Sequence, residues 1–519
     1  MTAAPRGNVR SMFTSGVASG DPLPDRVVLW TRCVPPSLGP VALTWVVARD
    51  PDLRHVVARG EALALPERDH TVHVDADGLD PATTYFFAFD DGEERSPVGR
   101  TRTTPEGAVE HLRIAVFSCA KFTAGYFNAL ARMADLDDLD LVLCLGDYIY
   151  EYGNADKGLG TRIGRPFEPA HRCRTLEDYR RRYAQSRRDP DMQRMHLRHP
   201  VVAIPDDHEF ADNAWRGGAK KHVPPADGRW DRRRADAFRA WREWMPVRMP
   251  DSEDATRLFR TMHLGELADL ILLDTRTRRD HQASGAEVER EDRTLLGAEQ
   301  FEWFTGELTQ SRAAWRLIGN GVMIGQVRTD YMPEDVGEPL SELGVLTPRD
   351  QGPEPDQWDG YPAERRRLIH DITDHDVRDV VFLSGDVHSS WACDLKLGSH
   401  DPEERSVAVE FCTTSATSEN LDEEAGWEPR TRSVPIEREI VEDNPHIAFC
   451  ELDSHGFLLV DVTPERVQAD WQYVDTVRRP SRSIRCGGSW MVRRGQHRLE
   501  EAPGPLRARS GEEPRRRAS

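Results

Sequence analysis

Long apolar runs are missing from this chain of 519 residues. A membrane-spanning helix needs about 20 consecutive apolar residues, and no stretch approaches that length. The first thirty residues contain neither the apolar core of a signal peptide nor a twin-arginine pair before a hydrophobic stretch. As written, the sequence therefore predicts no membrane span and a cytoplasmic protein.

Paired cysteines are also missing. The eight cysteines show no CxxC spacing and are few for the length of the chain, which argues against a disulfide scaffold. Several lie in apolar runs, such as Cys144 within residues 141–145, and these are expected to be small buried side chains. Cys119 differs, because it directly follows a predicted strand.

Basic residues are fewer than acidic ones: the chain has 69 Lys and Arg against 89 Asp and Glu, which gives a net charge of -20. This balance disfavours non-specific binding to nucleic acid and to anionic membranes. It also repels a phosphate-bearing substrate unless cations are bound in the site. Charged residues make up 30% of the chain and hydrophobic residues 38%, so most of it is expected to be globular.

Short strands separated by turn residues are predicted between residues 10 and 104, at residues 27–31, 41–48, 55–59, 71–74 and 83–89. This is the spacing of a small antiparallel β-sandwich. The segment from Gly78 to Tyr85 resembles the corner of fibronectin type III domains, where a tyrosine hydroxyl bonds to the preceding backbone. We therefore predict an N-terminal all-β, fibronectin-like domain over residues 10–104, with no chemistry of its own.

Apolar runs alternate with helical patterns after the linker at residues 103–107, which predicts an α/β domain over residues 110–475. Strands are predicted at residues 114–118, 141–145, 201–204, 270–273, 317–318 and 380–383. Four more, at residues 407–411, 447–451, 457–462 and 467–473, are expected to close a second sheet. Helices are predicted around residues 127–134 and 363–373, on the outer faces of the two sheets.

Two further segments lack apolar periodicity. Residues 151–200 are polar and contain no readable motif, so they are interpreted as long loops. Residues 476–519 are rich in arginine and are predicted to form a basic, disordered tail, in preference to an arm for an anionic partner.

Polar residues directly follow four of the predicted strands. Reacting groups in open α/β sheets collect just beyond the carboxyl ends of strands. Together these segments would bring several carboxylates, a phenol, a thiol and two histidines to one rim, and a bound cation is the simplest way to neutralise them. The segments are Ser118-Cys119, Gly146 to Tyr150, Asp206 to Glu209, and Gly385 to His388.

The candidate ligands differ in hardness. Cys119, Tyr150 and His388 suit a transition metal, and a thiolate together with a phenolate favours ferric iron. Asp207 and Asp386 offer oxygens to a hard divalent ion. Asp147 could bridge two metals, which in such sites lie about 3.5 to 4 Å apart.

An ordered series of motifs runs along the chain from residue 13 to residue 473, and with it the sequence resembles the alkaline phosphatase D family of calcineurin-like metallophosphoesterases. The resemblance implies an N-terminal fibronectin-like domain, a four-layer αββα catalytic domain, and hydrolysis of phosphomonoesters or phosphodiesters. It also implies iron with calcium as the metals, other divalent ions being alternatives. The motifs are GVASGDP at 16–22, VVLWT at 27–31, GDYIY at 146–150, DDHE at 206–209, QWDGY at 357–361 and GDVHSSW at 385–391.

Three elements of the wider superfamily can be matched position by position. Asp147 and Tyr150 match the GDxxY element. Asp207 stands where the superfamily has the asparagine of GNH, and His208 matches its histidine. In the GHxH element an aspartate, residue 386, replaces the first histidine and residue 388 matches the second.

Two departures from the superfamily affect the expected metals. The opening DxH element is missing, and Cys119 takes its ligand position, as in the alkaline phosphatase D branch. A further histidine expected near residues 319–323 is also missing, so the second site becomes all-oxygen and favours calcium over zinc. Asn213 could add an amide oxygen there.

The expected catalytic groups lie beside these ligands. His208 would stabilise the oxyanion or protonate the departing alkoxide, and Glu209 would orient the His208 side chain. Arg216 is a candidate to hold a non-bridging phosphate oxygen. The substrate would be a small or polymeric phosphoester, and no protein partner is predicted.

Two other functions remain open at this point. In the first, Cys119 is a covalent nucleophile with His208 or His388 as its base, and no metal is needed. In the second, the chain is a non-catalytic binding protein stabilised by structural metals.

Overall fold

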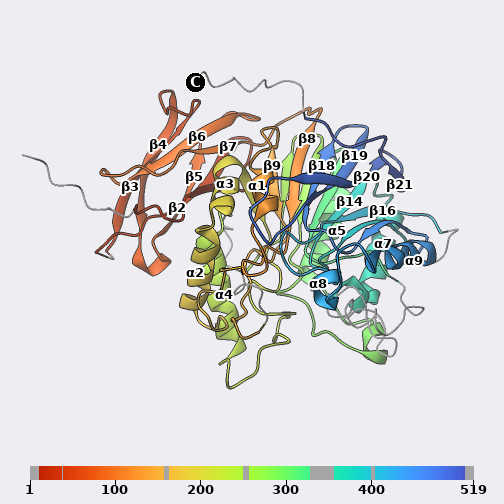
Figure 1. Ribbon diagram of the computed structural model, residues 1–519. Coiled ribbons are helices and arrows are strands. Elements are labelled where there is room, and N and C mark those ends of the chain that lie inside the picture. Colours follow the sequence, from red (N-terminus) through yellow and green to blue (C-terminus); the bar gives the residue numbers. More distant parts are fainter. Residues whose placement is uncertain are drawn as a thin grey trace, which may run out of the picture.

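Two large β-sheets pack face to face in this computed structural model, with helices on both outer faces (Figure 1). The structure describes residues 11–37, 39–156, 163–248, 256–327, 356–398 and 404–508. A strand-rich N-terminal region lies at one side of these layers. Within the described ranges no helix has the length and apolar character needed to cross a bilayer.

The first sheet has ten strands, and its centre consists of three parallel neighbours, β8, β9 and β10. The three central strands run in the same direction, so the residues that follow them leave the sheet at one edge. In order, the strands are β21 (Leu499–Glu501), β20 (Ile484–Arg493), β19 (Arg466–Val474), β18 (Gly456–Val462), β8 (Leu112–Phe117), β9 (Leu141–Cys144), β10 (Pro200–Ala203), β1 (Val17–Gly20), β2 (Arg26–Arg32) and β5 (Thr71–Asp77).

The second sheet has seven strands, and its central strands β12, β13, β14 and β16 are also parallel. In order, they are β11 (Arg260–Leu264), β12 (Ala268–Leu272), β13 (Trp315–Asn320), β14 (Val380–Ser384), β16 (Ala408–Cys412), β15 (Ser390–Leu395) and β17 (Ile447–Glu451). This sheet carries the fourth of the predicted site segments, after β14.

Strand β8 shows why the central strands are apolar without interruption. Its alternate residues Ile114 and Val116 belong to the core between the two sheets, whereas Ala115 and Phe117 face the core beneath the helices. A strand that is buried on both faces has no polar face, so apolar and polar residues do not alternate along its sequence. The outer helices of this sheet are α1 (Asn128–Met133), α2 (Leu176–Arg187), α3 (Pro190–Arg198) and α4 (Trp230–Trp244).

The seven-stranded sheet is covered by its own helices, whose apolar side chains Phe304, Leu368 and Ile440 pack in one core with Ile318 and Phe382 of the sheet. These helices are α5 (Ala298–Gln310), α7 (Pro362–Asp374) and α9 (Ser433–Asp443). The remaining short elements are α8 (Leu421–Ala425) and the 3₁₀ turns η1 (Pro66–Arg68), η2 (Gly285–Glu289) and η3 (Trp358–Gly360).

The N-terminal strands are divided between two sheets. A four-stranded sheet contains β4 (Val56–Ala64), β3 (Val41–Ala48), β6 (Thr84–Asp90) and β7 (Gly99–Arg102). The other strands of the region, β1, β2 and β5, continue the ten-stranded sheet, because β1 pairs in parallel with β10. The predicted corner contact is present, since the Asp80 backbone N–H donates to the Tyr85 hydroxyl over 2.9 Å.

Two predictions for the C-terminal part were wrong. The four last predicted strands do not close one sheet, because β16 and β17 join the seven-stranded sheet whereas β18 and β19 join the ten-stranded one. The predicted tail over residues 476–519 contains β20 and β21, which extend the ten-stranded sheet beyond β19. Strand β20 carries few buried apolar side chains, so its sequence lacked a strand signal. Residues 509–519 lie outside the described residues.

Residues 151–200, interpreted from the sequence as loops, contain the helices α2 and α3. The buried face of α2 carries Arg182, Gln185 and Arg187 as well as tyrosines. The sequence therefore lacks the apolar stripe that indicates a helix. Arg182 is buried because it donates to the carbonyl oxygens of Tyr152 at 2.8 Å and Pro169 at 2.9 Å. The helix therefore supports the segment that follows the Asp147 to Tyr150 turn.

Candidate metal centre

Four loops that follow β8, β9, β10 and β14 bring the predicted site residues together. Cys119, Asp147 and Asp207 leave neighbouring parallel strands of the ten-stranded sheet. Asp386 comes from the seven-stranded sheet, and its carbonyl oxygen lies 3.9 Å from the Cys119 sulfur. The two sheets thus meet in the site, and the prediction of one common rim agrees with the structure.

The backbone at this rim is strained. Five of the predicted ligands have a left-handed φ, which residues other than glycine rarely adopt: Cys119 (58°), Asp147 (53°), Asn213 (51°), Asp386 (71°) and His388 (49°). Such conformations cost about 1 to 3 kcal/mol each and gather at functional sites. Gly146 allows the close approach of the β9 and β10 loops, because a Cβ there would lie 2.3 Å from the Asp206 Cβ.

A first set of donors contains sulfur, nitrogen and oxygen. The ligand atoms of Cys119, Asp147 and His388 all lie within 4.8 Å of one another. The Tyr150 hydroxyl joins this set, at 3.1 Å from Asp147 Oδ2 and 3.3 Å from His388 Nε2. The His388 ring is oriented by its other nitrogen, which donates to the Glu419 carbonyl over 2.8 Å.

A second set contains only carboxylates. Donor atoms of Asp147, Asp206, Asp207 and Asp386 lie within 4.8 Å of one another, and Asp147 and Asp207 form a further such group with His208. Asp147 is common to all of these groups, as a bridging ligand would be. Asp207 Oδ1 is buried, accepts no hydrogen bond from the described residues and has Arg276 Nη2 at 3.9 Å, so its lone pairs remain available to a cation.

The electrostatics of the site call for added positive charge. Burial, the largest cause, raises the pKa of Asp147 and Asp386 well above the ordinary value for a carboxyl, and nearby carboxylates add to this rise. The charges of His208 and Arg276 offset only part of it. Burial likewise raises the pKa of the Cys119 thiol and the Tyr150 phenol. Bound cations would reverse these shifts.

Arg276 is the most important residue that sequence reasoning missed. It is fully buried, its Nε lies 2.6 Å from Asp206 Oδ1, and it pairs with Asp356 at 2.8 Å and with Asp386 at 3.3 Å. Asp206 accepts two hydrogen bonds from this guanidinium, whereas Asp386 and Asp207 lie farther from it, at 3.3 and 3.9 Å, which makes these two the better candidate ligands. The sequence feature that could have identified Arg276 is its position: it follows the strand β12, just as the predicted ligands follow their own strands.

His208 lies between aromatic rings and carboxylates. Its ring centroid is 4.0 Å from that of Tyr150 and 4.9 Å from that of Tyr152, and its Nδ1 lies 2.7 Å from Glu151 Oε2. Burial lowers the pKa of His208, but the carboxylates of Asp207, Asp147 and Glu151 outweigh burial and raise it well above the ordinary value. These carboxylates favour the protonated imidazole, whose Nδ1 lies against Glu151.

Glu209 does not orient His208, so this part of the sequence prediction is corrected. Its carboxylate points into the protein and accepts the backbone N–H groups of Asp147 at 3.0 Å, Tyr148 at 2.7 Å and Asp206 at 2.7 Å. Glu151 has the orienting role instead. Adjacent side chains leave a tight turn in different directions, and the sequence alone could not tell which glutamate faces His208.

Replacing Glu209 with alanine should destabilise the fold. Three buried N–H groups would lose their acceptor, which we expect to lower the free energy of unfolding by about 3 kcal/mol. Chemical unfolding followed by tryptophan fluorescence measures this loss, and Glu209→Gln, which keeps one acceptor oxygen, should lose less. Equal stability of all three proteins would show that these hydrogen bonds do not matter.

Asn213 contacts the site through its backbone rather than through its side chain. Its N–H donates to Asp207 Oδ2, and its carbonyl accepts from Gln282 over 3.2 Å. Asn213 thus positions one of the predicted ligands. The side-chain amide as a metal ligand stays a prediction.

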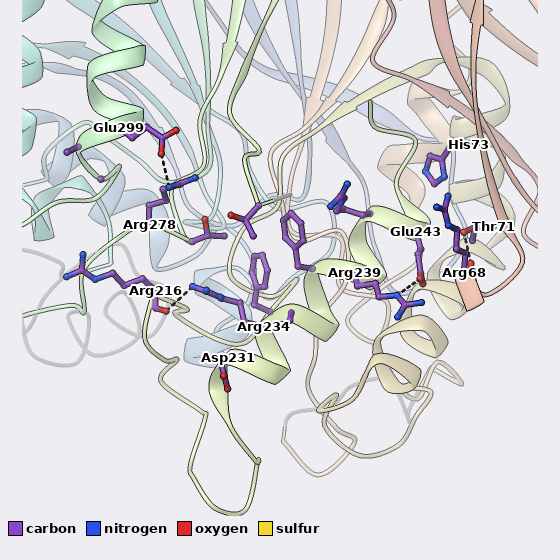
Figure 2. A pocket seen from close by; sticks show the side chains of 18 residues that line it. Arg68, Thr71, His73, Arg216, Asp231, Arg234, Arg239, Glu243, Arg278 and Glu299 are labelled. Atoms are coloured by element: carbon purple, nitrogen blue, oxygen red, sulfur yellow. Dashed lines mark hydrogen bonds and ion pairs between the residues drawn. The ribbon is translucent and has the colours of Figure 1, made fainter. Parts of the chain in front are cut away.

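Arg216 is not brought to the ligands. Its guanidinium pairs with Asp280, and its side chain is 60% exposed. It lines a separate pocket of about 940 Å³, bordered by α4 and the N-terminus of α5, in which arginines predominate (Figure 2). Arg234 on α4 donates to the Arg216 carbonyl oxygen over 3.0 Å. The predicted contact with a substrate phosphate at the metal site is not supported by this position.

Sequence comparison identifies related proteins. Residues 114–471 match the family model of PhoD-like phosphatases, and residues 1–105 match the model of the PhoD-like phosphatase N-terminal domain. The chain is 36% identical over 514 residues to alkaline phosphatase D of Bacillus subtilis (strain 168), covering 94% of this chain and 82% of that protein.

Solved structures give the same result. A structure of PhoD superposes with a TM-score of 0.83 at 34% identity, covering 97% of this chain and 94% of the other. The purple acid phosphatase PPD1 from yellow lupin (Lupinus luteus) seeds superposes with a TM-score of 0.54 at 13% identity, covering 92% and 73%, which shows a shared fold. The chain therefore belongs to the PhoD-like phosphatase family and is a metal-dependent phosphoester hydrolase.

Proposed function

We propose that this enzyme hydrolyses phosphomonoesters or phosphodiesters at a dinuclear centre that holds ferric iron and calcium. Cys119, Tyr150 and His388 would bind the iron, Asp207 and Asp386 the calcium, and Asp147 would bridge them. The first donor set supplies sulfur, phenol oxygen and imidazole nitrogen, whereas the second supplies carboxylate oxygen alone. Soft and mixed donors suit iron, and an all-oxygen set suits calcium.

Charge balance is the observation that best supports this pair of metals. A trivalent and a divalent cation together match the five anionic groups that would bind them: Cys119, Asp147, Tyr150, Asp207 and Asp386. The other charges at the site are already paired, Asp206 and Asp356 with Arg276 and Arg279, Glu151 with His208, and Glu419 with Lys121. A buried site is most stable when its charges cancel.

The side chains of this enzyme have defined tasks in the reaction. The metals, when bound, lower the pKa of a coordinated water and screen the charge of the phosphoryl group. His208 gives its proton to the departing alkoxide oxygen. Burial raises the pKa of Glu151, but the charge and hydrogen bond of His208, together with the charge of Arg233, outweigh burial and lower it to about 2, so Glu151 stays ionised and holds the imidazole. The rings of Tyr150 and Tyr152 restrict the rotation of His208.

Removal of the metals should abolish hydrolysis. Prolonged chelation is expected to reduce the turnover of one model monoester and one model diester to background, and iron plus calcium should restore it. Elemental analysis of the purified protein tests the proposed metals directly. The same two substrates show whether monoesters or diesters are preferred. Full activity without bound metal would refute the proposal.

A nucleophilic Cys119 is a weaker alternative. The thiol is completely buried, and burial together with Asp147 and Asp386 raises its pKa, so without a metal it is a poor nucleophile. Under this alternative, activity would survive chelation and be lost on thiol alkylation. The metal mechanism instead expects activity to be lost on chelation.

We also propose that the N-terminal region is fibronectin-like and that the catalytic domain begins near residue 110 and includes β20 and β21, beyond the boundary predicted at residue 475. The Asp80 to Tyr85 contact supports the first part. The pairing of β1 with β10 implies that the two parts fold together. Separate expression of residues 10–104 would test whether the two parts fold together, since the isolated region should then be unstable.

A further inference from the structure

The segment from Ser415 to Asn420, which follows β16, holds the residues of the first donor set. The backbone N–H groups of Thr417 and Ser418 donate to the Cys119 carbonyl over 3.3 and 3.2 Å. The Glu419 carbonyl accepts from His388 over 2.8 Å. The Ser418 hydroxyl lies 2.6 Å from the hydroxyl oxygen of Tyr150. One short segment thus contacts three of the proposed iron ligands.

The hydrogen-bond geometry decides where the Ser418 hydroxyl hydrogen points. Its two acceptors are the Tyr150 oxygen at 2.6 Å and the Cys119 carbonyl at 3.1 Å. That carbonyl already accepts two backbone N–H groups. Tyr150 can donate its own hydrogen to Asp147 Oδ2 over 3.1 Å only while it remains a phenol. As a phenolate, Tyr150 accepts, and Ser418 is the hydroxyl placed to donate to it.

Burial makes this donor hard to replace. Ser418 is 0% exposed and Tyr150 is 2% exposed, so bulk water does not reach the contact. A hydrogen bond from a neutral donor to an anionic oxygen is stronger than one between neutral groups. Groups outside the ligand set tune a metal through such bonds.

We propose that Ser418 is a positioning residue of the metal centre, whose hydroxyl donates to the metal-bound Tyr150 phenolate and limits how much charge that oxygen gives to the metal. This inference rests on the proposed role of Tyr150 as an iron ligand. A phenolate that donates less charge leaves the metal more electrophilic, which favours attack on an anionic phosphoryl group.

Visible absorption of the iron-loaded full-length protein tests the inference. A phenolate bound to ferric iron gives a charge-transfer band, and a hydrogen bond to the phenolate raises the energy of that band. Ser418→Ala should therefore move the band to longer wavelength and lower kcat by about 10- to 100-fold with full metal content. Thr417→Val is the matched control, because the Thr417 hydroxyl bonds the Lys121 carbonyl and not the phenolate.

The possible outcomes separate this inference from the metal assignment. A band that moves in Ser418→Ala and stays in place in Thr417→Val supports the role of Ser418. A band that is present and moves in neither variant overturns that role while leaving iron at the site intact, because the Cys119 thiolate would also give a charge-transfer band. Iron-loaded wild-type protein without any charge-transfer band overturns the assignment of Tyr150 and the inference with it.

Discussion

Asp147→Asn should lower kcat/KM by about a thousandfold or more, which corresponds to about 4 kcal/mol of lost transition-state stabilisation. Asp147 is the residue shared by every group of candidate ligands in the described part of the chain. An amide offers one neutral oxygen where the carboxylate offers two anionic ones, so it can no longer bridge two cations. Steady-state hydrolysis of a model monoester and a model diester measures the loss.

Elemental analysis belongs with this measurement. The variant is expected to lose at least one of its metals, whereas Asp137→Asn, at an exposed aspartate paired with Arg198 on the surface, should keep both metals and full activity. A variant at position 147 with near-normal turnover would remove the bridging role. Retention of both metals with lost turnover would instead limit Asp147 to the chemical step.

The convergence of the candidate ligands could be predicted from sequence because its signal is local. Each candidate ligand follows a short apolar run closely, and parallel strands at the centre of a sheet deliver such residues to one edge. Cys119 after β8 and Asp147 after β9 are examples in which the strand, the turn and the candidate ligand lie within a few residues of one another. The same local signal predicted most strands and the position of α7.

The contacts around the ligands could not be predicted, because they depend on the tertiary fold. Glu209 lies in one site segment and Glu151 directly follows another, and only the path of the chain decides that Glu151 faces His208 while Glu209 faces backbone. Arg216 carries the charge expected of a phosphate clamp but is turned toward Asp280. Sheet membership has the same limit, since β18 returns to pair with β8 across more than three hundred residues.

His208→Gln should lower kcat by about 10²- to 10⁴-fold, the range expected for loss of a general acid, with the metals retained. The cause is specific: protonation matters most when the departing alkoxide is a strong base. The loss should therefore be large for an alkyl phosphate and small for a nitrophenyl phosphate, whose leaving group departs without help. Elemental analysis and kcat for the two substrates measure both expectations.

Two glutamates provide the matched comparison for His208. Glu151→Gln removes the carboxylate that holds the imidazole 2.7 Å away, so it should show the same dependence on the leaving group in weaker form. Glu209→Gln, next to His208 in sequence but bonded to backbone, should lower stability without that dependence. If His208→Gln and Glu151→Gln each lost activity to the same extent on both substrates, His208 would not be the proton donor to the leaving group.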